Sequence, residues 1–351
     1  MTPIPEARAR VAIDLAAYRR NLALLVDSVR PSQVMAVVKA DAYGHGLVPI
    51  ARTAVSAGVG WLGALDTGTA VRLREAGIGR EARIFAWHLA PDEDYRPVIE
   101  AGIDLGVSTL AQLDQIADAR ATTAVRVHLK IDTGLHRNGA LPADWPAVVR
   151  RALELQSEGL AEVFGVWTHI AEASFREDSA AISRFETAIR EAEALGARFS
   201  LRHLAASAAG LARSDSRFDL VRFGAFGYGI SPGDGVSPSA LGLEPVMTLS
   251  STTIADAGGA TIVPLGFGDG ISSLAAGNVQ VSVAGRLVGI TRVERDRMIL
   301  AGSVDGGAEV VLFGPGTRGE WTLQQWADAT GTIGEEVVTR LVAAIPRCYS
   351  A

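Results

Sequence analysis

Lys39 is the residue whose type and position most clearly point to chemistry. It follows the apolar run Val34–Val38, which has the composition of a buried strand. An amine at the end of such a strand is partly removed from water, which lowers its pKa and makes it a usable nucleophile or base. A lysine that merely reaches the surface is the ordinary alternative. Residues 40–46 are rich in polar and flexible types, which favours the functional interpretation.

Other familiar catalytic patterns are missing from the sequence. The six histidines are scattered without an HExxH or another ligand spacing, so we expect no metal site. The single cysteine, Cys348, excludes an internal disulfide framework and a multi-cysteine metal site. We interpret His128 and Asp132 as polar groups satisfied at the end of a strand, and we assign them no catalytic role.

The elements that must position Lys39 alternate between strands and helices. Such alternation is typical of a parallel sheet covered by helices, and a span of about 230 residues fits a TIM barrel. A doubly wound sheet is the alternative, although no GxGxxG follows an early strand. The expected strands, the first of them a leader strand, are Val11–Ile13, Val34–Val38, Trp61–Leu65, Ala82–Trp87, Asp104–Val107, Val125–Ile131, Val163–Thr168, Phe199–Leu204 and Leu220–Phe223. The expected helices are Leu15–Val29, Leu47–Ala57, Thr67–Ala76, Leu110–Ala119, Trp145–Leu155 and Ala180–Leu195.

The amino-acid composition changes at the Gly/Pro/Ser-rich segment Ser231–Pro238, which indicates a linker. Short β-rich runs separated by turn signals follow it, and two helices are expected near Leu323–Ala329 and Ile333–Ala344. The sequence therefore predicts an α/β protein with a TIM (β/α)8 barrel over residues 1–235. A small, mainly-β domain is expected over residues 236–351.

Composition narrows the class of function. The chain has 351 residues, of which 48% are hydrophobic and 21% are charged, and its formal net charge is −6. A basic footprint for nucleic acid is missing, so we expect no nucleic-acid partner. The N-terminus has no apolar signal region, and no apolar stretch is long enough to span a membrane. We therefore expect a soluble, cytoplasmic protein without a membrane partner.

The segment Ala36–Gly46, AVVKADAYGHG, resembles the lysine motif of the alanine racemase family, whose members use pyridoxal 5′-phosphate (PLP). The match covers eleven consecutive residues and is highly specific. The resemblance implies that Lys39 forms a Schiff base with the cofactor and that Tyr43 contacts its phosphate. Further matches occur in order along essentially the whole chain, and they imply a PLP-binding barrel followed by a β-domain.

These further matches imply a site. The segment His128–Gly139 resembles the one that supplies a modified lysine, here Lys130, and a substrate-side arginine, here Arg137. The cofactor-binding residues implied by the resemblance are Lys39, Tyr43, His169, Ser207, Arg222, Gly224 and Ala225. Arg222 would face the pyridine nitrogen of the cofactor. Because a guanidinium does not readily release its proton, that nitrogen stays unprotonated, which favours reprotonation at Cα over transamination.

The sequence departs from the family at the second catalytic base. Racemisation needs a base on each face of Cα, and the family uses the Schiff-base lysine and a tyrosine from the partner's β-domain. That tyrosine belongs to a Gly-Tyr-Gly/Ala-Asp-Gly motif, which reads GFGDG at Gly266–Gly270 here, so Phe267 occupies its position. A phenyl ring neither accepts nor donates a proton. The segment Arg292–Arg297 likewise replaces the family's Ser-Met-Asp segment, which shapes the pocket for the substrate carboxylate.

Three functions are compatible with these features. The first is a PLP-dependent racemase of the alanine racemase type, which interconverts L- and D-alanine or a similar small amino acid and supplies D-amino acid for the cell wall. The second is a one-base PLP enzyme, such as an aldolase, lyase or decarboxylase. The third is a non-catalytic PLP-binding paralogue. The resemblance further implies a small amino-acid substrate and a head-to-tail homodimer that shares its active sites.

Overall fold

The computed structural model describes residues 9–172, 174–231, 236–255 and 260–351, and these form two compact units. The barrel unit contains Leu25–Lys39 and Ala54–Gly224. The β unit contains the chain up to Leu24, Ala40–Thr53 and the chain from Ala225 onward. The predicted boundary between residues 235 and 236 falls beside residues 232–235, part of the predicted linker, which lie outside the described residues.

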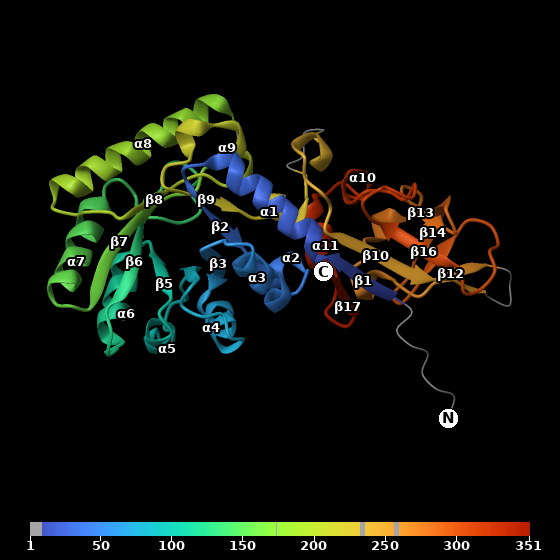
Figure 1. Ribbon diagram of the computed structural model, residues 1–351, viewed down its shortest axis with the longest axis horizontal. Helices are drawn as coiled ribbons and strands as arrows, with labels where there is room; N and C mark the ends of the chain where they lie inside the picture. Colours follow the sequence, from blue (N-terminus) through green and yellow to red (C-terminus); the bar gives the residue numbers. More distant parts are fainter. Residues whose placement is uncertain (1–8, 173, 232–235, 256–259) are drawn as a thin grey trace. The chain divides into compact units, whose positions relative to one another are not determined.

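The barrel unit is built on eight parallel strands (Figure 1). Their order is β8-β7-β6-β5-β4-β3-β2-β9. Backbone bonds also link the two ends of this sheet, from Asp219 N–H to Arg202 O at 3.0 Å and from Arg222 N–H to Ala205 O at 3.2 Å, so the barrel is nearly closed. The predicted (β/α)8 barrel is confirmed. The strands are β2 (Gln33–Val37), β3 (Trp61–Asp66), β4 (Arg83–His88), β5 (Asp104–Val107), β6 (Val125–Lys130), β7 (Ala161–Trp167), β8 (Leu201–His203) and β9 (Leu220–Phe223).

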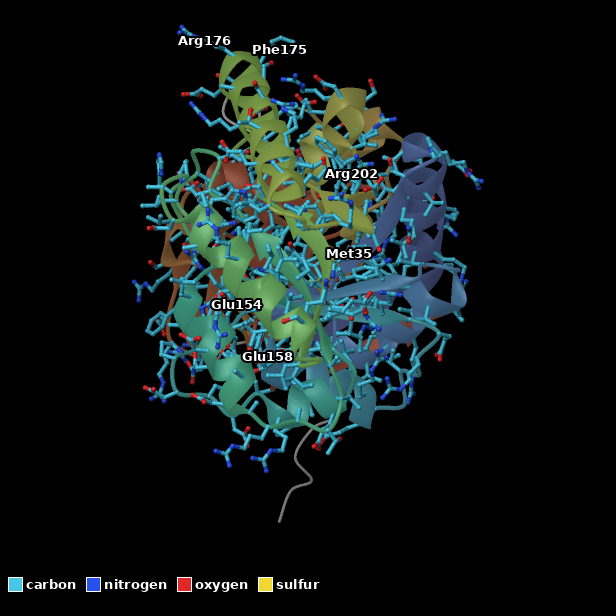
Figure 2. The ribbon with its side chains drawn as sticks, turned by 90° about the vertical axis from the view of Figure 1, so that its left-hand side faces the viewer. Met35, Glu154, Glu158, Phe175, Arg176 and Arg202 are labelled. Carbon is cyan, nitrogen blue, oxygen red and sulfur yellow. The ribbon has the colours of Figure 1, made fainter. Side chains whose placement is uncertain are left out.

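Amphipathic helices cover the outside of this barrel. In α7 the buried residues Trp145, Val148, Val149, Ala152 and Leu155 recur at helical spacing and face the strands. Figure 2 shows Glu154 on the outer side of this helix and Glu158 just beyond its end, while Met35 lies among the strands. The helices that lie within the barrel unit are α4 (Thr67–Glu75), α5 (Arg96–Glu100), α6 (Leu110–Asp118), α7 (Trp145–Ser157), α8 (Phe175–Ala194) and α9 (Ser207–Ala212), with the 3-10 turn η1 (Ser214–Ser216). The helices α1 (Leu15–Val29) and α3 (Leu47–Ser56) contain residues of both units.

The barrel interior is filled by side chains, as is usual for this fold. Large apolar residues from several strands form one buried cluster, whose members are Met35, Trp61, Phe85, Trp167, Leu201 and Leu220. Two histidines lie among these rings without exposure to solvent. His128 packs against Phe85 with ring centroids 4.7 Å apart, and His203 stacks on Trp167 at 5.5 Å.

The β unit contains a nine-stranded sheet in the order β11-β12-β15-β14-β13-β16-β10-β1-β17. Its β1 strand was expected to lead into the barrel, but it pairs with β10 and β17 instead. The predicted mainly-β fold of this part is confirmed. The strands are β1 (Ala9–Asp14), β10 (Met247–Thr252), β11 (Ile254–Ala255), β12 (Thr261–Val263), β13 (Gln280–Val283), β14 (Arg286–Val293), β15 (Met298–Leu300), β16 (Glu309–Phe313) and β17 (Arg347–Ser350).

Short helices complete the β unit. They are α10 (Leu323–Ala329) and α11 (Gly334–Arg340), with the 3-10 turns η2 (Ala225–Tyr228), η3 (Pro238–Leu241), η4 (Phe267–Asp269) and η5 (Ser273–Ala275). Within the described residues of the whole chain, we find no helix long and apolar enough to cross a membrane.

Candidate active site

Lys39 lies just beyond the carboxyl end of β2, at the end of a barrel where active sites are built. The backbone after it, α2 (Lys39–Tyr43), forms a left-handed turn in which Ala40, Asp41 and Ala42 have φ values of 52 to 54°. Each residue in this region costs about 1–2 kcal/mol, and such strain is concentrated at functional sites. Backbone bonds hold the turn, with Gly44 N–H donating to Ala40 O and Gly46 N–H to Asp41 O, each at 2.9 Å.

Arg222 is the most extensively bonded side chain of the site. It lies on β9 and is buried. Its Nη1 donates to Nδ1 of His203 at 3.0 Å. Its Nη2 bonds to the Thr168 and Leu204 carbonyls at 2.9 and 2.8 Å and to His169 Nδ1 at 3.1 Å. Burial lowers the pKa of Arg222 to about 9, so the guanidinium remains charged at neutral pH.

His169 and Lys130 lie close to this guanidinium. Burial and the charge of Arg222 lower the pKa of His169 to about 2, with smaller effects from Arg137, Lys130 and Lys39. The imidazole is therefore neutral. Lys130 is 3% exposed, bonds to Asn138 and lies 4.4 Å above the Trp167 ring. Burial, Arg222 and Arg137 lower its pKa to about 7, so much of the Lys130 amine is uncharged at neutral pH.

Ser207 and Gly224 meet in the same unit. Ser207 is the first residue of α9, and its hydroxyl accepts a bond from Gly224 N–H at 3.2 Å. The Glu172 carboxylate accepts from Ala209 N–H in the first turn of α9 at 2.7 Å. The Ser207 hydroxyl only accepts in its bond from Gly224, so its own proton can be donated to a phosphate, whereas the Gly224 and Ala209 N–H groups already have acceptors.

Tyr43 and Ala225, two further predicted cofactor residues, belong to the β unit. Ala225 is buried at the start of η2, and Tyr43 packs on Tyr228 with ring centroids 4.9 Å apart. Tyr228 also contacts the rings of Tyr18 and His45. Burial raises the pKa of Tyr43, so its hydroxyl stays protonated and can act as a donor.

Phe267 lies on the turn η4 and is 55% exposed, which is unusual for a phenylalanine. The turn is held by Phe267 N–H donating to Glu294 O at 2.9 Å and by Gly268 N–H donating to Arg295 O at 2.8 Å. Gly266 packs so closely on this segment that a Cβ would overlap the Glu294 carbonyl. The backbone therefore presents the ring of Phe267 on a well-fixed turn.

The structure adds residues that the sequence interpretation left out. His203 bonds directly to Arg222, and Trp167 lies beneath both Arg222 and Lys130. His203 ends β8, just as Lys130 ends β6, and parallel barrel strands bring such residues together. That pattern of polar residues at strand ends was the signal for His203. Trp167 carried no such signal, because an aromatic residue in an apolar run reads as core.

The donor set fits PLP. It offers an amine for the aldehyde at Lys39, a cation at neutral pH for the ring nitrogen at Arg222, and a hydroxyl for the phosphate at Ser207. It does not resemble a metal centre. Among the residues that the structure describes, no three or more His, Cys, Asp or Glu side chains are grouped to hold a metal ion.

A nearly closed parallel barrel with this lysine and this arginine, in a chain that also forms a mainly-β unit, defines a two-domain α/β protein whose barrel site fits PLP. Comparisons with known proteins identify the family. The family model for the alanine racemase N-terminal domain matches residues 13–232, and the model for the C-terminal domain matches residues 250–349. The chain therefore belongs to the alanine racemase family and is an enzyme of the isomerase class, as the sequence resemblance implied.

Relatives cover the full length of the chain. An alanine racemase of Thermobifida fusca is 40% identical over 100% of this chain and 99% of its own length. One of Streptomyces coelicolor is 40% identical over 97% and 96%, respectively. Among solved structures, alanine racemase from D-cycloserine-producing Streptomyces lavendulae superposes with a TM-score of 0.92 at 37% identity, covering 99% of this chain and 98% of that one.

Proposed function

We propose that the protein binds PLP and racemises alanine or a similar small amino acid, supplying D-amino acid for the cell wall. The observation that carries this proposal is the cluster at the carboxyl ends of the barrel strands. There the buried Arg222 holds a neutral His169 at 3.1 Å, and the charge of Lys39 is close enough to lower the pKa of that histidine.

Each residue of the cluster has a role in this proposal. When bound, PLP withdraws electrons from the amino acid and makes its Cα–H acidic. Lys39 holds the cofactor covalently and moves the proton on one face of Cα. Arg222 would donate to the ring nitrogen, and His169 would contact the ring. Tyr43, Ser207 and the backbone of Gly224 and Ala225 bind the phosphate.

Two other residues bind the substrate in this proposal. Arg137 pairs with the substrate carboxylate, for which a guanidinium fork is well shaped. Lys130 supports Arg137 and carries the modification that the family resemblance implies. Its pKa of about 7 favours such a modification, because the neutral amine is the nucleophilic form.

The cofactor assignment is tested by absorbance and by mass spectrometry. Lys39 and Lys130 are the only lysines in the sequence, which makes the assignment unambiguous. We expect a yellow protein with a visible band that Lys39→Ala abolishes and Lys130→Met retains. Borohydride reduction should fix the cofactor on the Lys39 peptide. A band that survives in Lys39→Ala, or an adduct on Lys130, would contradict the proposal.

Phe267 supports a second candidate, a one-base PLP enzyme or a non-catalytic PLP-binding paralogue. The turn that carries it presents a phenyl ring, which cannot move a proton, where the family resemblance implies a tyrosine. Incubation with L- or D-alanine in D₂O separates these functions. Exchange of Cα–H with inversion supports racemisation, exchange with retention supports one-base chemistry, and no exchange with any small amino acid supports the binding paralogue.

We further propose that the protein forms a head-to-tail homodimer in the cytoplasm. The basis is the full-length similarity to alanine racemases. Sedimentation equilibrium tests the assembly: a dimer mass is expected, and a monomer at micromolar concentration would contradict it. Cell fractionation tests the location.

A further inference from the structure

A continuous chain of hydrogen bonds leads from Arg222 through the interior of the barrel. Beyond the contact between Arg222 and His203, His203 Nε2 lies 3.0 Å from His128 Nδ1. His128 Nε2 in turn lies 3.4 Å from the Asp104 carboxylate. All three of His203, His128 and Asp104 have zero exposure to solvent. Asp104 is the first residue of β5, so this series of hydrogen bonds begins at the end of the barrel opposite to Lys39.

The chemistry of its two ends fixes the direction of every bond in this chain. A guanidinium only donates, so Nδ1 of His203 must accept and its proton must lie on Nε2. His203 Nε2–H then donates to His128 Nδ1, which places the proton of His128 on Nε2. A carboxylate only accepts, so Asp104 requires that same Nε2 proton of His128. The Arg222 cation and the Asp104 anion therefore both require the Nε2–H tautomer of the two histidines.

Asp104 itself is firmly fixed. Its Oδ1 accepts from Arg126 at 2.7 Å, and Arg83 lies 3.6 Å from its Oδ2. Burial raises the pKa of Asp104, but bonds from His128 and Arg126 outweigh burial and keep the pKa below its usual value. The carboxylate is therefore an anion in the core, where a charged group is retained only with such partners.

A protonated or flipped histidine would break the chain. If His203 carried its proton on Nδ1, the Arg222 guanidinium would lose an acceptor, and if His128 did so, two donors would meet between the two rings. Arg222 is the group that faces the cofactor in the proposed function, and the orientation of its donors depends on His203. The packing of Trp167 and Phe85 on the two rings excludes water that could replace a lost partner.

We propose that Asp104 is a positioning residue for Arg222, acting through His128 and His203, which it holds as Nε2–H tautomers. The catalytic part of this inference rests on the proposed function. The tautomers do not, because they follow from the bonds within the barrel unit. The ordinary alternative is that Asp104 only satisfies Arg126 and Arg83 and leaves the histidines indifferent to its charge.

The direct test is nitrogen NMR of the holoenzyme labelled with ¹⁵N-histidine. Long-range proton–nitrogen spectra distinguish the two neutral tautomers, and the variants His128→Gln and His203→Gln assign the resonances. We expect both rings as Nε2–H. An Nδ1–H tautomer or a doubly protonated ring at either position would overturn the proposal, with no variant of Asp104 required.

The second test is Asp104→Asn, with Asp219→Asn as the matched control. Asp219 also accepts two bonds from one guanidinium, that of Arg202, which Figure 2 labels, but it touches no imidazole. In Asp104→Asn the amide donors face either His128 or Arg126. We expect a changed tautomer or protonation state at His128 or His203 and kcat lower by about 10- to 100-fold, the usual range for an outer partner of a site. KM should change little.

The outcomes separate this inference from the proposed function. Unchanged ring spectra in Asp104→Asn, or equal changes in Asp219→Asn, would overturn the positioning role. Absence of a cofactor band with the predicted tautomers would overturn the proposed function and leave the positioning role of Asp104 toward Arg222 standing. If Asp104→Asn does not fold, the wild-type spectra keep the inference falsifiable, because an Nδ1–H or doubly protonated ring at His128 or His203 overturns it.

Discussion

The core of the barrel unit and the η4 turn of the β unit hold their candidate catalytic side chains in place by different kinds of hydrogen bonds. In the barrel, Arg222 and His203 belong to a buried network in which each ring nitrogen along the chain has a partner. On η4, the bonds are made by the backbone of Phe267 and Gly268, and the side chain is half exposed. A network of side chains cannot lose one member without leaving a buried polar group unpaired. A turn held by its backbone can lose a hydroxyl freely.

This difference gives a physical reason for the predicted departure from the family at Phe267, beside a barrel that keeps the residues the resemblance implies. Replacing an exposed ring by one that lacks a hydroxyl leaves the fold unchanged, since surface substitutions typically alter stability by less than about 0.5 kcal/mol. A phenylalanine in place of the predicted tyrosine is therefore expected to be neutral for folding and to affect only the reaction. The barrel residues combine both roles, so a loss there affects folding as well.

Phe267→Tyr is the largest effect that we predict. A general acid or base contributes about 10²- to 10⁴-fold, so the variant should raise the rate of racemisation within that range. Stability should remain within about 0.5 kcal/mol, because the side chain is half exposed and the backbone of the turn is unchanged. Circular dichroism of alanine measures the rate, and urea denaturation measures the stability.

Phe267→Leu is the matched control, because it changes the same exposed position without adding a proton donor. A gain in Phe267→Leu equal to that in Phe267→Tyr would show that a group other than the hydroxyl is responsible. No gain in either variant would mean that the pocket has changed beyond this ring, for example through Arg292–Arg297, and would favour the one-base alternative.

The second prediction uses a buried histidine of the β unit. His45 donates from Nδ1 to the Tyr43 carbonyl at 2.8 Å, while its Nε2 has no hydrogen-bond partner among the described residues. Burial lowers its pKa to about 4. Between pH 6.5 and 4 the unfolded chain binds a proton that the folded protein does not, so stability falls as pH falls, by about 3 kcal/mol over that window.

His45→Asn removes this loss, because an amide can still donate to the Tyr43 carbonyl but does not titrate in this range. Urea denaturation at pH 7 and at pH 4 should therefore show a shallower decline in the variant than in the wild type. His88→Asn, at an exposed position on β4, is the control. Equal declines in wild type and His45→Asn would show that His45 does not contribute to the acid sensitivity.

Much of the fold could be predicted because hydrophobic periodicity is local. The helix expected over Leu15–Val29 has those bounds in the structure, and β5 and β9 also match their expected ranges. α8 begins at Phe175, five residues before its predicted start, because Ser174 caps the helix with a hydroxyl that accepts from Glu177 N–H at 3.2 Å. The sheet of β1 could not be predicted from its own residues, because its partners β10 and β17 lie near the other end of the sequence.

The site was predictable as a set of residue types but not as a network. A motif identifies Lys39 and Arg222, and their proposed roles remain predictions. The left-handed turn of Ala40–Asp41–Ala42 has no sequence signal, because these residues rarely adopt a positive φ. The pairing of His128 and His203 depends on side chains 75 positions apart that meet only in the closed barrel, so His128 read as an isolated polar residue at a strand end.

The smallest effect that we predict concerns the Asp269 side chain, which accepts from Gly266 N–H at 2.9 Å and so closes the η4 turn. Asp269→Ala should cost about 1 kcal/mol of stability, the usual value for a lost cap, and Asp269→Asn should cost less because its oxygen can still accept. If the Asp269 bond positions the side chain of residue 267, the double variant Phe267→Tyr/Asp269→Ala should lose most of the rate gained by Phe267→Tyr alone. A double variant as fast as the single one would mean that the backbone bonds to Glu294 and Arg295 position the ring without help from Asp269.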